Sequence, residues 1–294
     1  MSARYLTLNI TPELAGLEVN TLLRRRLGLS GTVLRRVKWL EDSITLDGAR
    51  VNVRVRVREG QTPAPVSGVV PVEGPLDIVY EDPDIIVLNK AAGVLVHPGH
   101  GHFDDTLGNF LMYYYKNTGE ESDFHPVHRL DKGTSGLVVV AKHPHAQEKL
   151  KNQLHTGDFR RVYLAICDGT PPEASGTVDA PIGPVEGSPT AREVRPDGRP
   201  ARTRYRVLRT WGPRSLVELE LETGRTHQIR VHMAHIGCPL TGDFLYGRSN
   251  PALIARPALH SARLKLTHPI TRERLCFSAP LPADMAALIP GENI

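Results

Sequence analysis

The stretch "HRLDKGTSGLVVVA", from His128 to Ala141, joins a dense group of polar side chains to an uninterrupted apolar run. The apolar part, Leu137 to Ala141, is short and β-branched, which indicates a fully buried strand. The polar part then forms the loop that enters this strand, and loops held by a rigid scaffold commonly carry function. Asp131 is therefore a candidate catalytic carboxylate, although a loop aspartate before glycine is also typical of a turn or cap.

A second strand follows at "RRVYLAIC", Arg160 to Cys167, with alternate residues on opposite faces. A helix beginning at Pro144, in "PHAQEKLKNQL", joins it to the first strand, because proline is favoured in the first helical turn. Tyr163 therefore lies near Asp131 if the two strands are close. The alternative is an ordinary half-buried tyrosine whose hydroxyl is hydrogen-bonded.

A third segment reads "LETGRTHQIRVHMAHIGCPLTGD", from Leu221 to Asp243. It predicts the end of a strand at Thr223 and then a helix with Thr226 as its N-cap and Gly237 just beyond its end. Arg230 is 60° from His227 on the helical wheel, since each residue turns by about 100°. One face of this helix therefore offers Arg230 and His227 together.

The same helix carries three histidines, which raises the question of a metal site. No pair among His227, His232 and His235 has the i,i+4 spacing of helical zinc ligands, so no metal is predicted. A fourth segment, "DPDIIVLNKAAG", predicts a strand followed by Lys90 in a glycine-bearing loop that suits an anion or a backbone approach. The Pro/Gly-rich piece from 171 to 200 predicts strands with a long connection.

Composition restricts the class of protein. The 294 residues contain no apolar run long enough for a membrane span, and the N-terminus lacks the form of a secretion signal. Three widely spaced cysteines argue against a disulfide framework and favour a reducing compartment. These features predict a cytoplasmic protein that has no membrane association, and we expect a monomer.

Positive charge is concentrated near the N-terminus. Residues 20–60 contain ten Lys/Arg against four Asp/Glu, whereas the whole chain carries a net charge of only +4. A basic module of this kind commonly binds a polyanion, and the alternative is a solvated basic surface. Two helical patterns precede a hairpin that turns at Asp47-Gly48, and the order resembles the S4 domain, a small RNA-binding module.

The prolines and glycines of Gln61 to Pro75 predict a linker. The chain therefore divides into an S4-like domain (1–62), a linker (63–75) and a larger domain (76–294). The alternative role of the module's arginines is to protect a sheet edge from pairing. The predicted RNA contacts of the module are Arg24, Arg25, Arg35, Arg36, Lys38, Arg54 and Arg56.

The segments of the larger domain together resemble the RluA-type pseudouridine synthases. "HRLDKGTSGL" is similar to their catalytic motif, "RVYLAI" to their tyrosine segment and "LETGRTHQIRVHMAHIGCPLTGD" to a third signature. The resemblance implies that Asp131 is the catalytic carboxylate, that Tyr163 stacks on the target uracil and can also help to remove a proton, and that Arg230 pairs with Asp131. It also implies that Arg129 fills the gap left when the base swings out of the RNA.

The resemblance further implies an α+β fold: a mixed, largely antiparallel sheet with flanking helices and a central cleft. The implied reaction is the isomerisation of uridine in RNA, with no cofactor and no metal, since nothing is oxidised or hydrolysed on balance. Large-subunit ribosomal RNA is the favoured substrate, and transfer RNA is possible. Two rival functions stay open: a non-catalytic RNA-binding factor for ribosome assembly, and a glycoside or nucleoside hydrolase, which usually needs two carboxylates.

Overall fold

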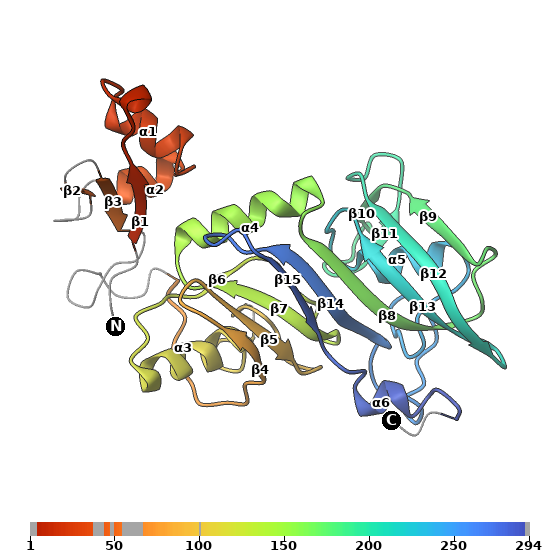
Figure 1. The fold of residues 1–294 in the computed structure, drawn as a ribbon. Helices are drawn as coiled ribbons and strands as arrows, with labels where there is room; N and C mark the ends of the chain where they lie inside the picture. Colours follow the sequence, from red (N-terminus) through yellow and green to blue (C-terminus); the bar gives the residue numbers. More distant parts are fainter. Residues whose placement is uncertain (1–4, 38–43, 48–49, 55–66, 100, 292–294) are drawn as a thin grey trace.

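The computed structural model describes residues 5–37, 44–47, 50–54, 67–99 and 101–291. Figure 1 shows a small N-terminal body of short elements and a larger body built on one long, twisted sheet. Each body has its own hydrophobic cluster. None of the helices in the described residues is long and apolar enough to cross a membrane.

The small body contains a three-stranded antiparallel sheet in the order β1-β3-β2, packed on two short helices. The two predicted helices and the predicted hairpin are present, and β1 is an addition that the sequence patterns did not predict. Asp47 pairs with Arg50 across the hairpin, while the turn residues 48–49 lie outside the described part of the chain. The elements are β1 (Tyr5–Asn9), η1 (Pro12–Leu14), α1 (Val19–Arg25), α2 (Gly31–Val37), β2 (Ile44–Asp47) and β3 (Arg50–Arg54).

The larger body begins with an extended segment, residues 67–75, that has no helix or strand, as its proline content predicts. The Asn109 side chain holds this segment by donating a hydrogen bond to the carbonyl of Val70 (2.8 Å). The strands are β4 (Ile78–Glu81), β5 (Ile85–Lys90), β6 (His125–Pro126), β7 (Ser135–Ala141), β8 (Arg160–Asp168), β9 (Ser175–Asp179), β10 (Ile182–Pro184), β11 (Arg192–Val194), β12 (Arg202–Trp211), β13 (Arg214–Leu221), β14 (Leu259–Thr267) and β15 (Arg274–Ser278). The helices are α3 (Leu107–Thr118), α4 (Pro144–Thr156), α5 (Gln228–His235) and α6 (Ala283–Ala286).

The main sheet runs in the order β4-β5-β7-β14-β8-β13-β12-β9, with β15 beside β14 and β6 beside β7. Among its described pairings only β7 with β14 is parallel, and the others are antiparallel. The mixed, largely antiparallel sheet that the family resemblance implied is therefore confirmed. The Pro/Gly-rich region contributes β9 to the main sheet, while β10 and β11 form a separate two-stranded sheet.

Helices cover both faces of the sheet, because its central strands are apolar on both sides. On β5, Ile85 and Val87 belong to the cluster with α4, whereas Ile86 and Leu88 belong to the cluster with α3 and α5. All seven residues of β7 are buried. Burial of each large apolar side chain contributes about 1.5–3 kcal/mol, so this double-sided packing fixes the middle of the sheet firmly.

Local signals set the ends of α4. The His143 ring is the N-cap and accepts a hydrogen bond from the backbone N–H of Ala146 (3.2 Å). Pro144 follows at the first helical position, as predicted. Gly157 ends the helix with φ +80°, a conformation that glycine adopts without steric cost.

Three strands meet in register at Ser261 of β14. Ser261 pairs with Gly136 of β7 on one side and with Tyr163 of β8 on the other. Gly136 has φ +108°, and a Cβ at this position would lie 2.3 Å from the Ser261 carbonyl oxygen. The close approach of β7 to β14 therefore requires glycine, and it brings the loop that precedes β7 next to Tyr163.

We predict that Gly136→Ala lowers the free energy of unfolding by about 3 kcal/mol or more, because strain at positive φ adds to a backbone clash. Gly187→Ala is the matched control, since Gly187 also has positive φ (+73°) but has no atom within 4 Å of the added Cβ. That control should cost only about 1–2 kcal/mol. Urea unfolding followed by circular dichroism measures both, and equal losses would contradict the proposed close approach.

Candidate active site

A cleft of about 340 Å³ opens where the loop before β7, strand β8 and the segment between β13 and α5 come together. All three residues assigned to catalysis by the family resemblance, Asp131, Tyr163 and Arg230, line it, and so does Arg129. Its volume is near the lower end of the range of about 300–1,000 Å³ for small-molecule sites. The cleft can therefore hold one nucleotide unit rather than a folded RNA element.

Lys90 fixes one side of the loop that carries Asp131. This lysine is the last residue of β5 and is 1% exposed. Its ammonium group donates hydrogen bonds to the carbonyls of Ala91 (2.8 Å), Val94 (2.7 Å) and Lys132 (3.4 Å). A turn bond from Thr134 N–H to the Asp131 carbonyl (3.0 Å) completes the loop. The sequence predicted Lys90 in a loop that suits an anion. In the structure its ammonium group has a structural role, because it holds Lys132, the residue that follows Asp131.

Arg256 holds the other side of the same loop. Its guanidinium donates to the carbonyls of Gly133 (3.1 Å) and Leu259 (3.2 Å) and forms a bidentate ion pair with Asp284 (2.7 and 2.8 Å). It therefore ties the Asp131 loop to the start of β14 and to α6. No sequence pattern marks Arg256, because Gly133 and Asp284 lie far from it in the chain.

The Asp131 carboxylate itself is half-buried, and its side chain forms no hydrogen bond or ion pair with any other residue that the structure describes. Its negative charge nevertheless acts on Lys90, His227 and Arg230. Burial lowers the pKa of Lys90 to about 7, and the negative charge of Asp131 opposes that decrease. Burial also lowers the pKa of His227, again against the effect of Asp131. The carboxylate thus faces the cleft with its oxygen lone pairs available.

Arg230 has a different direct partner from the one implied by the family resemblance. It donates two hydrogen bonds of 2.7 Å to Asp243, and both side chains are almost fully buried. Burial alone would lower the pKa of Arg230, but the bond to Asp243 and the charges of Asp243 and Asp131 outweigh it and raise that pKa. Asp131 therefore interacts with Arg230 through its electric field, while Asp243 holds the guanidinium in place.

Two aromatic side chains complete the setting of Arg230. Its guanidinium carbon lies 5.0 Å from the ring centre of Tyr246 and 5.7 Å from that of Phe244, distances typical of cation–π contacts. The Tyr246 hydroxyl accepts from the backbone N–H of Arg192 (2.9 Å) and is also hydrogen-bonded to Nδ1 of His227 (2.7 Å).

The N-terminus of α5 differs from the prediction. The N-cap is His227, with φ +57°, and not Thr226. A non-glycine residue in the left-handed region is strained, and such strain often accompanies functional sites. The predicted end of the helix is confirmed, since Gly237 follows the C-cap with φ +79°.

Tyr163 is 4% exposed, and its ring belongs to the core on the α3 and α5 side of the sheet. Burial raises the pKa of its hydroxyl, Asp131 raises it further, and Arg161 and Ser261 oppose the change. The hydroxyl therefore stays protonated at neutral pH. The other buried cleft residue with a marked shift is His128, whose pKa is lowered to about 3 by burial and by Arg161.

The remaining residues predicted to contact RNA differ in how much of their side chains the structure describes and exposes. Arg129 is exposed at the cleft, between the buried residues His128 and Leu130. In the small body Arg24, Arg25 and Arg35 are exposed. Arg36 and Arg54 lie in α2 and β3 with side chains outside the described part of the chain, and Lys38 and Arg56 are outside it entirely.

Comparison with known proteins identifies the family. A family model described as RNA pseudouridylate synthase matches residues 84–235, just over half of the chain.

The chain belongs to the RNA pseudouridine synthase family.

The chain is 43% identical over 251 residues to the uncharacterized RNA pseudouridine synthase YhcT of Bacillus subtilis. The alignment covers 85% of this chain and 81% of the relative. It is 42% identical over 273 residues to the ribosomal large subunit pseudouridine synthase D of Yersinia pestis, with 86% and 84% covered. A solved structure of human RNA pseudouridylate synthase domain containing 1 aligns with a TM-score of 0.58 and 29% identity, over 70% of this chain and 83% of that one. The protein is thus an isomerase that converts uridine to pseudouridine, as the resemblance implied.

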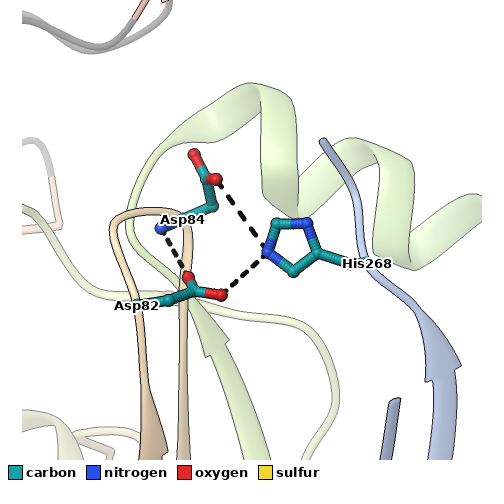
Figure 2. A group of neighbouring side chains, drawn as sticks. All are labelled: Asp82, Asp84 and His268. Atoms are coloured by element: carbon teal, nitrogen blue, oxygen red, sulfur yellow. Dashed lines mark hydrogen bonds and ion pairs between the residues drawn. The ribbon is translucent and has the colours of Figure 1, made fainter. Parts of the chain in front are cut away.

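One cluster of the synthase has the composition of a metal site among the described residues: Asp82, Asp84 and His268. Figure 2 shows the imidazole facing both carboxylates. Nδ1 of His268 already accepts hydrogen bonds from the backbone N–H groups of Ile270 (3.2 Å) and Thr271 (2.9 Å). Nε2 must then carry the proton that it donates to Asp82 (2.9 Å), so no lone pair is left for a metal ion.

The cluster is better described as a tie between the β4–β5 turn and the turn after β14. His143 is oriented in the same way, with Nδ1 accepting from Ala146 N–H and Nε2 donating to Asp84 (3.0 Å). Burial alone would raise the pKa of Asp82, but hydrogen bonds from His268 and from the backbone N–H groups of Asp84 and Ile85 outweigh it. They lower that pKa from 3.8 to about 2.

The lowered pKa predicts a pH-dependent contribution of Asp82 to stability. A depressed carboxyl pKa stabilises the folded state above the unfolded pKa, and this contribution disappears as pH falls from about 4 to about 2. Asp82→Asn should therefore reduce the free energy of unfolding at pH 7 by on the order of 1 kcal/mol, and the difference from wild type should shrink below pH 4. Urea unfolding at pH 7, 5, 4 and 3 measures it.

Asp104→Asn, at an exposed aspartate, controls for the loss of one negative charge. A difference between Asp82→Asn and wild type that stays constant from pH 7 to pH 3 would show that the carboxylate does not act through its ionisation.

Proposed function

We propose that Asp131 is the nucleophile with which this synthase isomerises uridines, and that its substrate is large-subunit ribosomal RNA. The observation that carries the proposal is the Asp131 carboxylate, unbonded to any described residue, in a nucleotide-sized cleft beside Tyr163 and Arg230. The substrate assignment rests on relatives named ribosomal large subunit pseudouridine synthase D, of which the Yersinia pestis protein is one.

The reaction breaks the bond between N1 of uracil and C1′ of ribose and forms a bond between C5 and C1′. C5 loses a proton and N1 gains one, so the atoms balance without an oxidant or water. The freed uracil must stay bound while it turns, and a nucleophile must assist the cleavage. A carboxylate with free lone pairs, held on a loop fixed by Lys90 and Arg256, fits this requirement.

Tyr163 is suited to stacking on the uracil. Its ring is fixed in the core, and its hydroxyl pKa is raised, so at neutral pH it carries its proton and is a poor base. Stacking against a rigid aromatic ring offsets part of the cost of extruding a base, which is a few kcal/mol. We assign the stacking role to Tyr163 and no role in removing the C5 proton.

Arg230 and Arg129 then have separate tasks. Arg230, held by Asp243, keeps a permanent positive charge beside the site where the nucleoside reacts. Arg129 is exposed at the mouth of the cleft, where its side chain can occupy the gap in the RNA stack. Buried residues of the cleft, among them Tyr163 and Arg230, limit the access of water and so protect the separated base and sugar from hydrolysis.

We also propose that residues 1–62 form an S4-like RNA-binding domain joined by a linker, residues 63–75, to the catalytic domain, residues 76–294. A separate hydrophobic cluster within the small body supports this division. Its helices carry the exposed arginines Arg24, Arg25 and Arg35, for which the structure describes no carboxylate partner. Such residues are placed to contact phosphates.

Asp131→Asn tests the nucleophile, because it removes the charge and keeps the shape. In a strain that lacks the native gene, wild-type protein should restore pseudouridines in large-subunit ribosomal RNA, and Asp131→Asn should not. With purified proteins the rate should fall by about 10³-fold or more while RNA binding stays within a few-fold of wild type. Asp158→Asn, at an exposed aspartate outside the cleft, is the control.

The rival functions give different results in the same assay. A non-catalytic assembly factor would leave the pseudouridine map unchanged with either protein. A nucleoside hydrolase would release free uracil and leave abasic RNA. New pseudouridines in transfer RNA alone would reject the ribosomal substrate and keep the nucleophile.

The module is tested through the salt dependence of RNA binding. Replacing Arg24, Arg25 and Arg35 by Gln should weaken binding of ribosomal RNA transcripts and reduce the slope of log affinity against log salt by about two to three, since each lost phosphate contact removes about 0.7–0.9. The matched control replaces Arg160, Arg204 and Arg206, which are already paired with Glu220, Glu222 and Glu218. An unaltered slope in the first variant would show that its arginines are only solvated surface.

A further inference from the structure

A second hollow of about 610 Å³ lies beside the catalytic cleft. Strands β10 and β11, the turn after β11 and the segment Gly224–Thr226 form its walls. Gly224, Arg225 and Thr226 line both hollows, so the two are adjacent at this segment. We call the second hollow the hairpin groove.

The hairpin groove is strongly positive. It is lined by Arg192, Arg195, Arg199 and Arg225 and by a single acidic residue, Asp197, which gives four positive charges against one negative. Arg195 neutralises that negative charge, because it binds Asp197 through two hydrogen bonds of 2.5 and 2.9 Å. Three of the arginines therefore supply uncompensated charge.

Those three arginines, Arg192, Arg199 and Arg225, keep N–H donors that form no hydrogen bond to any carboxylate that the structure describes. Arg192 donates to the Ala191 carbonyl (2.7 Å) and Arg225 to the Pro200 carbonyl (3.0 Å), while Arg199 is exposed. Among the described residues none of the three has a carboxylate within ion-pair distance. A guanidinium has five N–H donors, so each of them keeps most of its hydrogen-bonding capacity for a ligand.

The groove is a built structure and not a chance gathering of surface arginines. The backbone of Ile182 and Arg199 pairs across its floor, and a Cβ at Gly198 would lie 2.6 Å from the carbonyl carbon of Ile182. Arg195 also donates to the Pro184 carbonyl (3.0 Å), which fixes the turn against β10. The charges are therefore presented from a rigid frame, which lowers the entropic cost of binding.

A hydrogen-bond chain connects this frame to the catalytic cleft. The backbone N–H of Arg192 donates to the Tyr246 hydroxyl, which is hydrogen-bonded in turn to His227. The ring of the same tyrosine lies against Arg230. The position of β11 is thus coupled to the side chains that surround Asp131.

We propose that the hairpin groove binds the backbone of a single RNA strand, through the phosphates of the nucleotides next to the target uridine. The inference rests on the proposed function, because an RNA whose uridine enters the catalytic cleft must continue away from it on both sides. Arg225 lines both hollows, so a strand that passes over it leaves the cleft next to the groove. Guanidinium groups bind phosphate oxygens through paired, charge-assisted hydrogen bonds, which matches the three unpaired arginines.

The neighbouring surface of β12 also carries arginines, but these arginines are paired with carboxylates. Its arginines Arg204 and Arg206 are more exposed than Arg192 and Arg225 of the groove, but they are paired with Glu222 and Glu218. Their charge is already neutralised within the protein, so that surface offers a phosphate little. The groove is therefore favoured over β12 as the path of the strand.

Binding of a fluorescein-labelled oligonucleotide of ten uridines, measured by anisotropy from 50 to 400 mM salt, tests the groove directly. The full-length double variant Arg199→Gln/Arg225→Gln should bind about 10-fold more weakly or worse at low salt. Its slope of log affinity against log salt should be smaller by about 1.4, since single-stranded contacts contribute about 0.7 each. Arg199→Lys/Arg225→Lys keeps the charges and should restore most of the slope.

Arg206→Gln/Arg263→Gln is the matched control, because both arginines are paired with Glu218. It should bind as wild type does, and thermal melting of every variant checks folding. An affinity and slope equal to wild type in Arg199→Gln/Arg225→Gln would overturn the groove proposal.

Failure of the groove and failure of the proposed function are distinguishable. Pseudouridine formation by wild-type protein on a ribosomal RNA transcript is measured separately from oligonucleotide binding. If wild type modifies the transcript and the double variant binds normally, the groove proposal is wrong and the function stands. If the double variant loses its salt slope and wild type forms no pseudouridine, the groove binds RNA and the function is wrong.

Discussion

The register at Ser261 is the constraint on which the active site depends. This one residue of β14 pairs with Gly136 and with Tyr163, so the parallel contact of β7 and the antiparallel contact of β8 are fixed at the same point. Asp131 lies only a few residues before β7, and its loop is tied to the frame by Lys90 and Arg256. A slip of one residue in the β8–β14 pairing would turn Tyr163 to the other face of the sheet, and a slip in the β7–β14 pairing would displace the loop of Asp131.

Local patterns in the sequence predicted the helices and strands themselves better than the strands with which each of them pairs. The burial of β7, the start of α4 at Pro144 and the alternation along β8 all follow from residue type and spacing. The proximity of Asp131 and Tyr163 could be predicted only conditionally, because it depends on β14, which lies almost 100 residues beyond Tyr163 in the chain. Pairing over such a distance leaves no periodic signal in either strand.

Arg230 illustrates the same limit at the level of one side chain. Helical geometry predicted the face that it shares with His227, but a wheel shows only neighbours on the same helix. Its partner, Asp243, follows threonine and glycine in a pattern typical of a turn, so nothing in the sequence marked it as the holder of a buried charge. The consequence is that the Arg230 guanidinium is occupied by Asp243 and that the Asp131 carboxylate forms no direct bond to it.

Pairing separates the arginines of this protein into two groups with different physical roles. Arg230 and Arg256 each meet a carboxylate in bidentate geometry, because an unpaired buried charge would cost several kcal/mol. Arg129, Arg199 and Arg225 have no such partner among the described residues, and they lie along the surface from the cleft to the hairpin groove. Unpaired guanidinium groups gain most from a ligand that supplies the missing negative charge at regular intervals. An RNA strand threaded through the cleft supplies it, so the distribution of paired and unpaired arginines marks the path of the substrate.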